Sequence, residues 1–167
     1  KTEIIKNDDD WDNGVAVAPF QANLYILDTK DGILKFVPSG KDYSKNDYLK
    51  DSADFSKAKS MAIDSAVWVL LSDGTIKKYL RGAEESFSVK NLDKPFSNPS
   101  KIFTDADTDS LYVLDNGNSR IAVLSKDGTF QKQYAARMLK DDKDFEVLEK
   151  DKKINVLVKD KFFEIPL

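Results

Sequence analysis

Four short apolar runs recur along the 167-residue chain at a nearly constant spacing, and this repeat constrains the fold more than any other feature. The runs begin at Leu24, Val67, Leu111 and Ile154, so successive starts lie 43, 44 and 43 residues apart. Each run is rich in β-branched and aromatic residues and too short for a helix. The repeat therefore predicts four equivalent β units, each with a buried strand at its centre.

Each central run is flanked by further strand-like segments at similar offsets. We expect first strands at 15–18, 61–64, 102–105 and 145–149, and third strands at 33–37, 75–80, 121–124 and 162–166. Fourth strands are predicted at 86–90 and 129–134, with a weaker one within 41–49. Asp-Gly pairs at 31–32, 73–74 and 127–128 supply the positive-φ residue that a tight hairpin needs.

Four strands every 43 residues or so is the period of a β-propeller blade. We therefore predict an all-β fold, a single β-propeller domain over 1–167, with blades at about 14–49, 58–90, 99–134 and 144–167. The last blade ends after its third strand, and the strand-like residues 2–6 are expected to complete it. A β-sandwich also contains many short strands, but it requires no repeating period.

How the ring closes is left open by the sequence. The chain could form a closed four-bladed ring, half of a ring completed by a second chain as a homodimer, or part of a larger ring. Lys1 rather than Met stands first, which we interpret as a mature or partial chain, with an extracytoplasmic domain favoured.

Two missing residue types narrow the chemistry. With no Cys and no His, the chain has no thiolate ligands, no disulfides, and neither the commonest general base nor the commonest transition-metal ligand. A net charge of −3 lacks the basic footprint of a nucleic-acid binder. No apolar run reaches the length of a membrane span, so we expect neither nucleic acid binding nor membrane insertion.

The third repeat resembles the NHL family of propeller repeats. Pro99 and Asp105 bound its first strand, and Asp115, Asn118 and Arg120 match the family's Asp-X-X-Asn-X-Arg turn. The resemblance covers about 99–134 and is weaker elsewhere, since the first repeat lacks the Asn and Arg and the second has Leu71 in place of the turn aspartate. NHL propellers usually have six blades, and their members include scaffolds, RNA binders, sensors and a lyase. The resemblance therefore implies a fold more than a function.

Two polar groups are candidate sites. We interpret Asp115, Asn118 and Arg120 as a structural turn in which the side chains hydrogen-bond across the hairpin. The alternating carboxylates Asp105, Asp107 and Asp109 resemble the start of a calcium loop, although the expected glycine and glutamate are missing. A solvated hairpin loop is the favoured interpretation, and no cofactor is expected, with calcium as the alternative.

The segments that join one blade to the next lie on one face of a propeller and are the best candidates for a binding face. Their aromatic and arginine side chains are typical interface anchors, although each one could instead pack under its loop. These residues are Tyr43, Tyr48, Phe55, Phe96 and Arg137.

The sequence predicts a non-enzymatic module that binds a protein or small ligand, with no catalytic residues. The alternatives are a carboxylate-based hydrolase, for which no spacing of acids selects a pair, and a calcium-stabilised spacer. The lyase chemistry of NHL relatives depends on metal-binding histidines, which this chain lacks.

Overall fold

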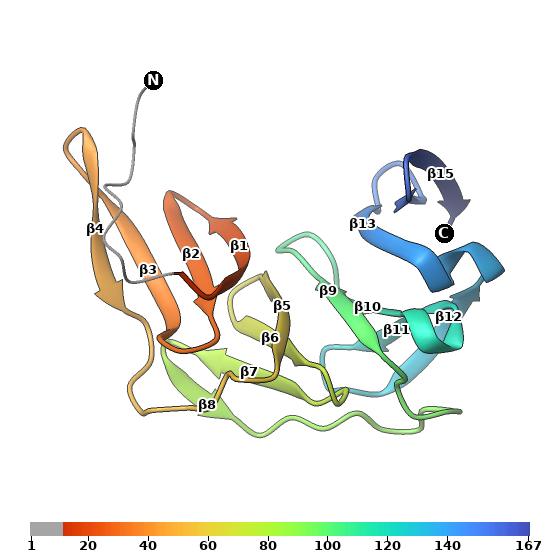
Figure 1. Cartoon of the computed structure of the whole chain (residues 1–167), viewed down its shortest axis with the longest axis horizontal. Helices are drawn as coiled ribbons and strands as arrows, with labels where there is room; N and C mark the ends of the chain where they lie inside the picture. The colour runs from red at the N-terminus through yellow and green to blue at the C-terminus, as the bar shows by residue number, and fades with distance from the viewer. Residues whose placement is uncertain (1–11) are drawn as a thin grey trace.

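The computed structural model describes residues 12–167, with 141–143 described by their backbone alone. Within that range the chain forms four antiparallel sheets, which we call blades 1 to 4 in chain order (Figure 1). Blade 1 contains β1 (Gly14–Phe20), β2 (Asn23–Asp28), β3 (Gly32–Ser39) and β4 (Asp42–Asp47). Blade 2 contains β5 (Ala58–Ile63), β6 (Val67–Leu71), β7 (Ile76–Leu80) and β8 (Ala83–Glu85).

Blades 3 and 4 follow the same order, with each strand paired to its neighbour in sequence. Blade 3 contains β9 (Pro99–Phe103), β10 (Ser110–Asp115), β11 (Arg120–Ser125) and β12 (Phe130–Ala135), with the 3-10 helix η1 (Asn116–Asn118) between β10 and β11. The 3-10 helix η2 (Arg137–Asp141) leads to blade 4, which contains β13 (Asp142–Leu148), β14 (Lys153–Val158) and β15 (Lys161–Pro166). The chain is an all-β propeller with four blades, which confirms the predicted fold class.

The Asp-Gly turns have the predicted backbone geometry. Gly32, Gly74 and Gly128 have φ values of 85°, 89° and 91°. A side chain is strained in this region, so glycine is the residue that allows these hairpins to turn tightly.

One predicted strand is wrong. The fourth strand of blade 2 was expected at 86–90, but β8 is Ala83–Glu85 and pairs with β7 directly across a turn at Arg81 and Gly82. Residues 86–90 instead leave the blade, and Lys90 bridges to Thr129 of blade 3. The alternation of Phe87 with polar residues imitated a strand because this side chain packs against Trp68 with ring centroids 5.1 Å apart.

Three hydrophobic cores join the blades in series. The core between blades 1 and 2 includes Leu27 and Val69, that between blades 2 and 3 includes Leu70 and Val113, and that between blades 3 and 4 is described below. Blades 2 and 3 are thus packed on both sides, and all five residues of β6 are buried. The first strands lie side by side, with β1 against β5, β5 against β9 and β9 against β13.

Within the described residues, blade 4 packs against another blade on one of its two faces only. Ile154, Val156 and Val158 of β14 belong to the core with blade 3, whereas the alternate residues of this strand are only partly buried. We call the opposite face of blade 4, which carries Asn155 and Leu157, the free face.

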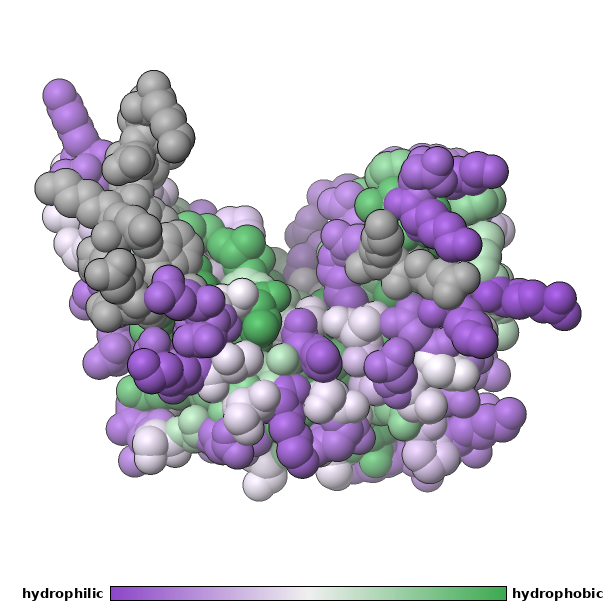
Figure 2. All heavy atoms as spheres, in the orientation of Figure 1, coloured by the Kyte–Doolittle hydropathy of each residue, from purple (hydrophilic) through white to green (hydrophobic). Residues whose placement is uncertain are grey.

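The blades follow an arc that does not close in the described structure. Blade 1, in red and orange, and blade 4, in blue, stand on opposite sides of a hollow in Figures 1 and 2. The predicted completion of the last blade by residues 2–6 lies outside the described residues, within which blade 4 has three strands. Within the same range, no helix has the length and apolar character needed to cross a membrane.

Candidate functional site

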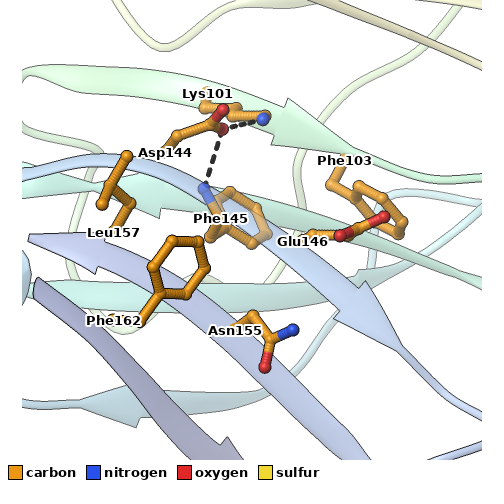
Figure 3. A pocket seen from close by; sticks show the side chains of 8 residues that line it. All are labelled: Lys101, Phe103, Asp144, Phe145, Glu146, Asn155, Leu157 and Phe162. Atoms are coloured by element: carbon orange, nitrogen blue, oxygen red, sulfur yellow. Dashed lines mark hydrogen bonds and ion pairs between the residues drawn. The ribbon is translucent and has the colours of Figure 1, made fainter.

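A groove of about 290 Å³ lies at the blade 4 end of the arc, where β9 meets β13 and the free face of blade 4 (Figure 3). Its walls come from four strands. The lining residues are Lys101, Phe103, Asp144, Phe145, Glu146, Asn155, Leu157 and Phe162. The groove is the candidate functional site.

Strand register determines which side chains reach the groove from blade 4. Glu146 lies opposite Asn155, and Leu157 lies opposite Phe162. Directly opposed residues of antiparallel strands project to the same side of the sheet, so these four share the free face. Phe145, next in sequence to Glu146, is buried in the core between blades 3 and 4 and reaches the groove at its edge.

An ion pair and two rings form the deep part of the groove. Lys101 of β9 forms an ion pair with Asp144 of β13, and its Nζ lies 5.8 Å from the centroid of the Phe145 ring. Asp144 Oδ1 also accepts the backbone N–H of Phe145 at 2.8 Å (Figure 3). The rings of Phe103 and Phe145 lie 6.1 Å apart at an angle of 52°. The ion pair therefore holds blade 3 to blade 4, and the rings of Phe103 and Phe145 make the groove surface beside it largely aromatic.

The wall behind the groove is held by an uncharged tyrosine. Tyr112 packs edge-on against Phe103 with centroids 6.3 Å apart, and its Oη donates to Glu149 Oε1 at 3.0 Å. Burial raises the pKa of Tyr112, and the Glu149 carboxylate raises it further. The hydroxyl therefore stays protonated at neutral pH and donates to the Glu149 carboxylate, which fixes the Tyr112 ring behind Phe103.

The mouth of the groove is open and apolar on the β15 side. Phe162 is 74% exposed, and Glu146 is exposed on β13, on the other side of β14. An exposed phenylalanine beside a groove is a typical feature of a docking surface. The arrangement can accept an apolar side chain from a partner, and a basic group next to it would meet Glu146.

Asp115, Asn118 and Arg120 come together in a single turn of blade 3, away from the groove. Asp115 is fully buried, and its Oδ2 accepts from Arg120 Nε at 2.8 Å and from Asn118 Nδ2 at 2.7 Å. Its Oδ1 accepts the backbone N–H of Ser97 at 2.8 Å. The triplet therefore ties the turn to the segment that leads into blade 3.

The predicted binding-face residues do not share one exposed surface. Phe55 is 1% exposed and belongs to the core between blades 1 and 2, so it is not an exposed anchor. Phe96 is half-buried against the core of blades 2 and 3, and Tyr43 packs on a small cluster within blade 1. Arg137 is exposed at the start of η2.

Tyr48 lines a second groove, of about 640 Å³, between blades 1 and 2. Its hydroxyl donates to the carbonyl of Tyr79 at 3.4 Å, and burial raises the pKa of Tyr48. This groove has a mixed lining of charged, amide and aromatic groups: Tyr25, Lys35, Val37, Asn46, Asp47, Tyr48, Ser65 and Arg81.

The candidate calcium loop forms local contacts instead of a ligand cage. Asp105 Oδ1 accepts the backbone N–H of Asp107 at 2.9 Å, and Asp107 forms an ion pair with Lys150 at 3.0 Å. Asp109 is exposed. Among the described side chains, those of 12–140 and 144–167, no group of three or more acidic residues is placed to hold a metal ion.

Sequence reasoning missed the groove itself. Phe162 falls in a predicted third strand, but whether its side chain is buried or exposed depends on which face of blade 4 is covered. Phe103 lay in a predicted first strand, with no signal that its ring would border an opening. The nearest signal was the Phe162-Phe163 pair in the final strand. Successive side chains of a strand point to opposite faces, so this pair puts one large apolar residue on each face of the sheet.

Comparisons with known proteins support the fold and no closer relationship. No family model matches the chain, and no curated protein matches it. Among solved structures, the computationally designed Ika4 protein is similar with a TM-score of 0.67 at 13% identity, covering 100% of this chain and 99% of that one.

Two natural propellers are similar over about half of their own length. Virginiamycin B lyase from Staphylococcus aureus has a TM-score of 0.58 at 13% identity, covering 92% of this chain and 55% of the lyase. The WD40 β-propeller domain of Doa1 has a TM-score of 0.62 at 10% identity, covering 92% of this chain and 51% of the other. At these identities the likeness shows the propeller fold alone.

Proposed function

We propose that this propeller is a non-enzymatic protein-binding module that docks its partner at the groove between β9 and the free face of blade 4. The observation that carries the proposal is Phe162, a large apolar side chain exposed to 74% at the mouth of an aromatic groove. The similarity to WD40 and designed propellers supports a binding or scaffold role in general terms.

The dimensions of the groove favour a protein partner over a small ligand. Its volume of about 290 Å³ is at the lower limit of the 300–1,000 Å³ that small-molecule pockets usually span, and Phe162, one of its lining residues, is largely exposed to solvent. A protein segment can insert one apolar side chain and cover Phe162 at the same time. Such a buried aromatic anchor commonly supplies much of an interface's binding free energy.

Selection of a displayed peptide library on the chain tests this proposal. We expect the native chain to enrich peptides with an apolar residue, and the Phe162→Asp chain to bind those peptides at least ~10-fold more weakly, because the change places a charge in the docking surface. Ser86→Asp, an equal charge change at an exposed residue of the middle of the arc, is the matched control and should leave binding unchanged.

The proposal fails if the selected peptides bind the Phe162→Asp chain as well as the native one, or if no peptide is enriched. A hydrogen-exchange footprint of the peptide complex adds a second measurement. We expect protection to increase in β13 and β15, the strands that carry Glu146 and Phe162.

We also propose that the chain is an NHL-type propeller. The support is the buried turn of blade 3, in which Asp115 accepts from both Asn118 and Arg120. Neither alternative function, hydrolase or calcium-stabilised spacer, is favoured by a specific observation among the described residues.

A further inference from the structure

The three interfaces inside the chain all join the same two kinds of blade surface. One face of each blade packs against the next blade in the chain. In blades 1, 2 and 3 this face carries Leu27 of β2, Leu70 of β6 and Leu114 of β10. The next blade contributes the other of its two faces, which carries Val69 in blade 2, Val113 in blade 3 and Val156 in blade 4. The interface is therefore directional, and each blade has one surface for the blade before it and one for the blade after it.

The two ends of the arc carry one unmatched surface of each kind. Blade 4 has the free face, on which Leu157 corresponds to Leu114 of blade 3 by the 43-residue period. On blade 1, Val17 of β1 lies opposite Ile26, away from the core with blade 2. A repeat protein buries such surfaces by stacking another unit on them.

The exposed large apolar side chains of the described structure lie only at these two ends. They are Val15 at 44% and Val17 at 63% in β1, and Phe162 at 74% and Phe163 at 37% in β15. Blades 2 and 3 contribute none to this set. The distribution is the one expected when the ends, and not the middle of the arc, contact another molecule.

The size of the arc indicates how much is needed to complete a ring. The similarity to the two natural propellers above covers 92% of this chain but only 51% and 55% of theirs. A hollow separates blade 1 from blade 4 in Figure 2. A second body of about the same size, with the same two end surfaces, would fill it.

We propose that a second copy of this chain is the partner, and that two arcs related by a two-fold axis close into one eight-bladed ring. The free face of blade 4 in one copy, with the groove and Phe162, then packs on the Val15 and Val17 side of blade 1 in its partner, and the same contact is repeated once. A head-to-tail contact of this type gives a closed ring when its rotation returns to the start. This inference rests on the proposed function, since it names the partner of the same groove.

The composition of the free face predicts a reversible dimer. Leu157 and Phe162 share it with Asp144, Glu146, Asn155 and Glu164, so four of these six side chains are polar. Interfaces of this mixed character are typical of partners that also exist apart, whereas permanent ones resemble a domain core.

The mass of the native chain in solution is the first test. By sedimentation velocity across a concentration series, we expect a species of twice the 18.8 kDa chain mass that dissociates on dilution. Val17→Asp and Phe162→Asp should each weaken dimerisation at least ~100-fold, because each change is present in both contacts of the dimer. Ser86→Asp should leave the dissociation constant unchanged.

Mixing the two weakened variants tests the head-to-tail geometry. A Val17→Asp copy and a Phe162→Asp copy together retain one fully native contact, between the native blade 4 of the first and the native β1 of the second. We therefore expect heterodimers to form in the mixture more tightly than either variant self-associates. A symmetric contact of blade 4 with blade 4 predicts instead that Val17→Asp has no effect, and that result overturns the proposal.

The same measurements separate this inference from the proposed function. A native chain that stays monomeric above about 10 µM, where micromolar affinity would populate the dimer, overturns the inference. If Phe162→Asp still weakens peptide binding in that case, the groove remains a docking site for another protein. If Phe162→Asp changes neither dimerisation nor peptide binding, both proposals fail.

Discussion

At the residue scale, buried carboxylates hold the turns that end the second strands. Asp28 and Asp115 are both fully buried. Asp28 Oδ1 accepts the backbone N–H groups of Lys30 and Asp31 at 2.8 and 3.0 Å, so backbone donors satisfy it. Asp115 accepts one backbone N–H, from Ser97, and its second carboxylate oxygen accepts from the side chains of Asn118 and Arg120. Both carboxylates are thus satisfied, and only the turn of blade 3 uses an arginine to do so.

Replacing Asp115 by alanine should be strongly destabilising. Arg120 is 2% exposed and would keep a buried positive charge without its closest buried partner. Removing one member of a buried ion pair typically costs 3–5 kcal/mol, and we expect about 3 kcal/mol in the free energy of unfolding measured with urea.

Asp93→Ala is the matched control, because it removes the other carboxylate that Arg120 contacts, and that carboxylate is 42% exposed. We expect a clearly smaller loss of stability for this variant. Equal losses for the two variants would show that burial of the pair does not set the cost.

Asp127 should titrate at unusually low pH. The hydroxyl of Ser125 donates to its carboxylate, as does the backbone N–H of Thr129 at 3.1 Å, and these bonds lower the pKa of Asp127 to about 2. A carboxyl whose folded pKa is depressed contributes stability above its unfolded pKa of about 3.9, and this contribution is lost as the pH falls toward 2.

Carbon-13 NMR titration of the side-chain carboxyl measures this directly. We expect a midpoint near pH 2 in the native chain and a higher one in Ser125→Ala, which lacks the first donor. A native midpoint near the ordinary aspartate value would contradict the assignment of these hydrogen bonds.

At the element scale, the segments between blades lock neighbouring sheets together. After β8, the chain runs to the start of β12, where the backbone N–H of Lys90 donates to the Gly128 carbonyl at 2.8 Å. The N–H of Phe130 donates back to the Lys90 carbonyl at 3.0 Å. These bonds join blade 2 to blade 3 outside their shared core, and they require a close approach of two backbones.

Gly128→Ala should disrupt this junction more than a comparable change elsewhere. A Cβ at Gly128 would clash with the carbonyl oxygen of Ser88, in addition to the cost of φ 91°. Gly40 has φ 64° with open space around its Cβ position, so Gly40→Ala isolates the backbone cost.

We expect about 1 kcal/mol for Gly40→Ala and about 3 kcal/mol for Gly128→Ala in urea unfolding. The difference between the two measures the close approach at Ser88. If both variants lose the same amount, the junction yields without cost and does not lock the blades.

The misplaced fourth strand of blade 2 belongs to this scale. Phe87 and Val89 alternate with polar residues as in a strand, yet they cover the core between blades 2 and 3 from a connecting segment. Alternation of apolar and polar residues shows that one side of an extended segment is buried. A connecting segment that crosses an interface between blades is also buried on one side, although it does not pair in a sheet.

At the scale of the whole molecule, burial differs between the middle and the ends of the arc. All five residues of β6 are buried, whereas β14 alternates between buried and half-buried. Blades with neighbours on both sides should open less often than a blade with one. Stability should therefore fall toward blade 4 in the monomer.

Hydrogen exchange should show this gradient and its dependence on concentration. We expect amides of β15 to exchange faster than those of β6 and β10 at high dilution. Their protection should increase as the chain dimerises, because binding stabilises the bound form by mass action. Phe162→Asp should abolish that increase, with Ser86→Asp retaining it. Uniform exchange at all concentrations would contradict the gradient.

The sequence by itself determined the parts of this protein that depend on near neighbours in the chain. The spacing of the runs at Leu24, Val67, Leu111 and Ile154 specified the blades, and the Asp-Gly pairs specified the hairpins. Both follow from local sterics and the alternation of side chains along a strand, which a few consecutive residues suffice to reveal.

Only the tertiary structure decided which faces are covered. Phe55, predicted to be an anchor in a connecting segment, is buried, whereas Phe162, in a predicted strand, is exposed. Whether the arc closes depends on the packing angle at each blade contact, which is set by side chains more than 40 residues apart. The groove exists because the free face of blade 4 has no described neighbour, and no repeat period contains that information.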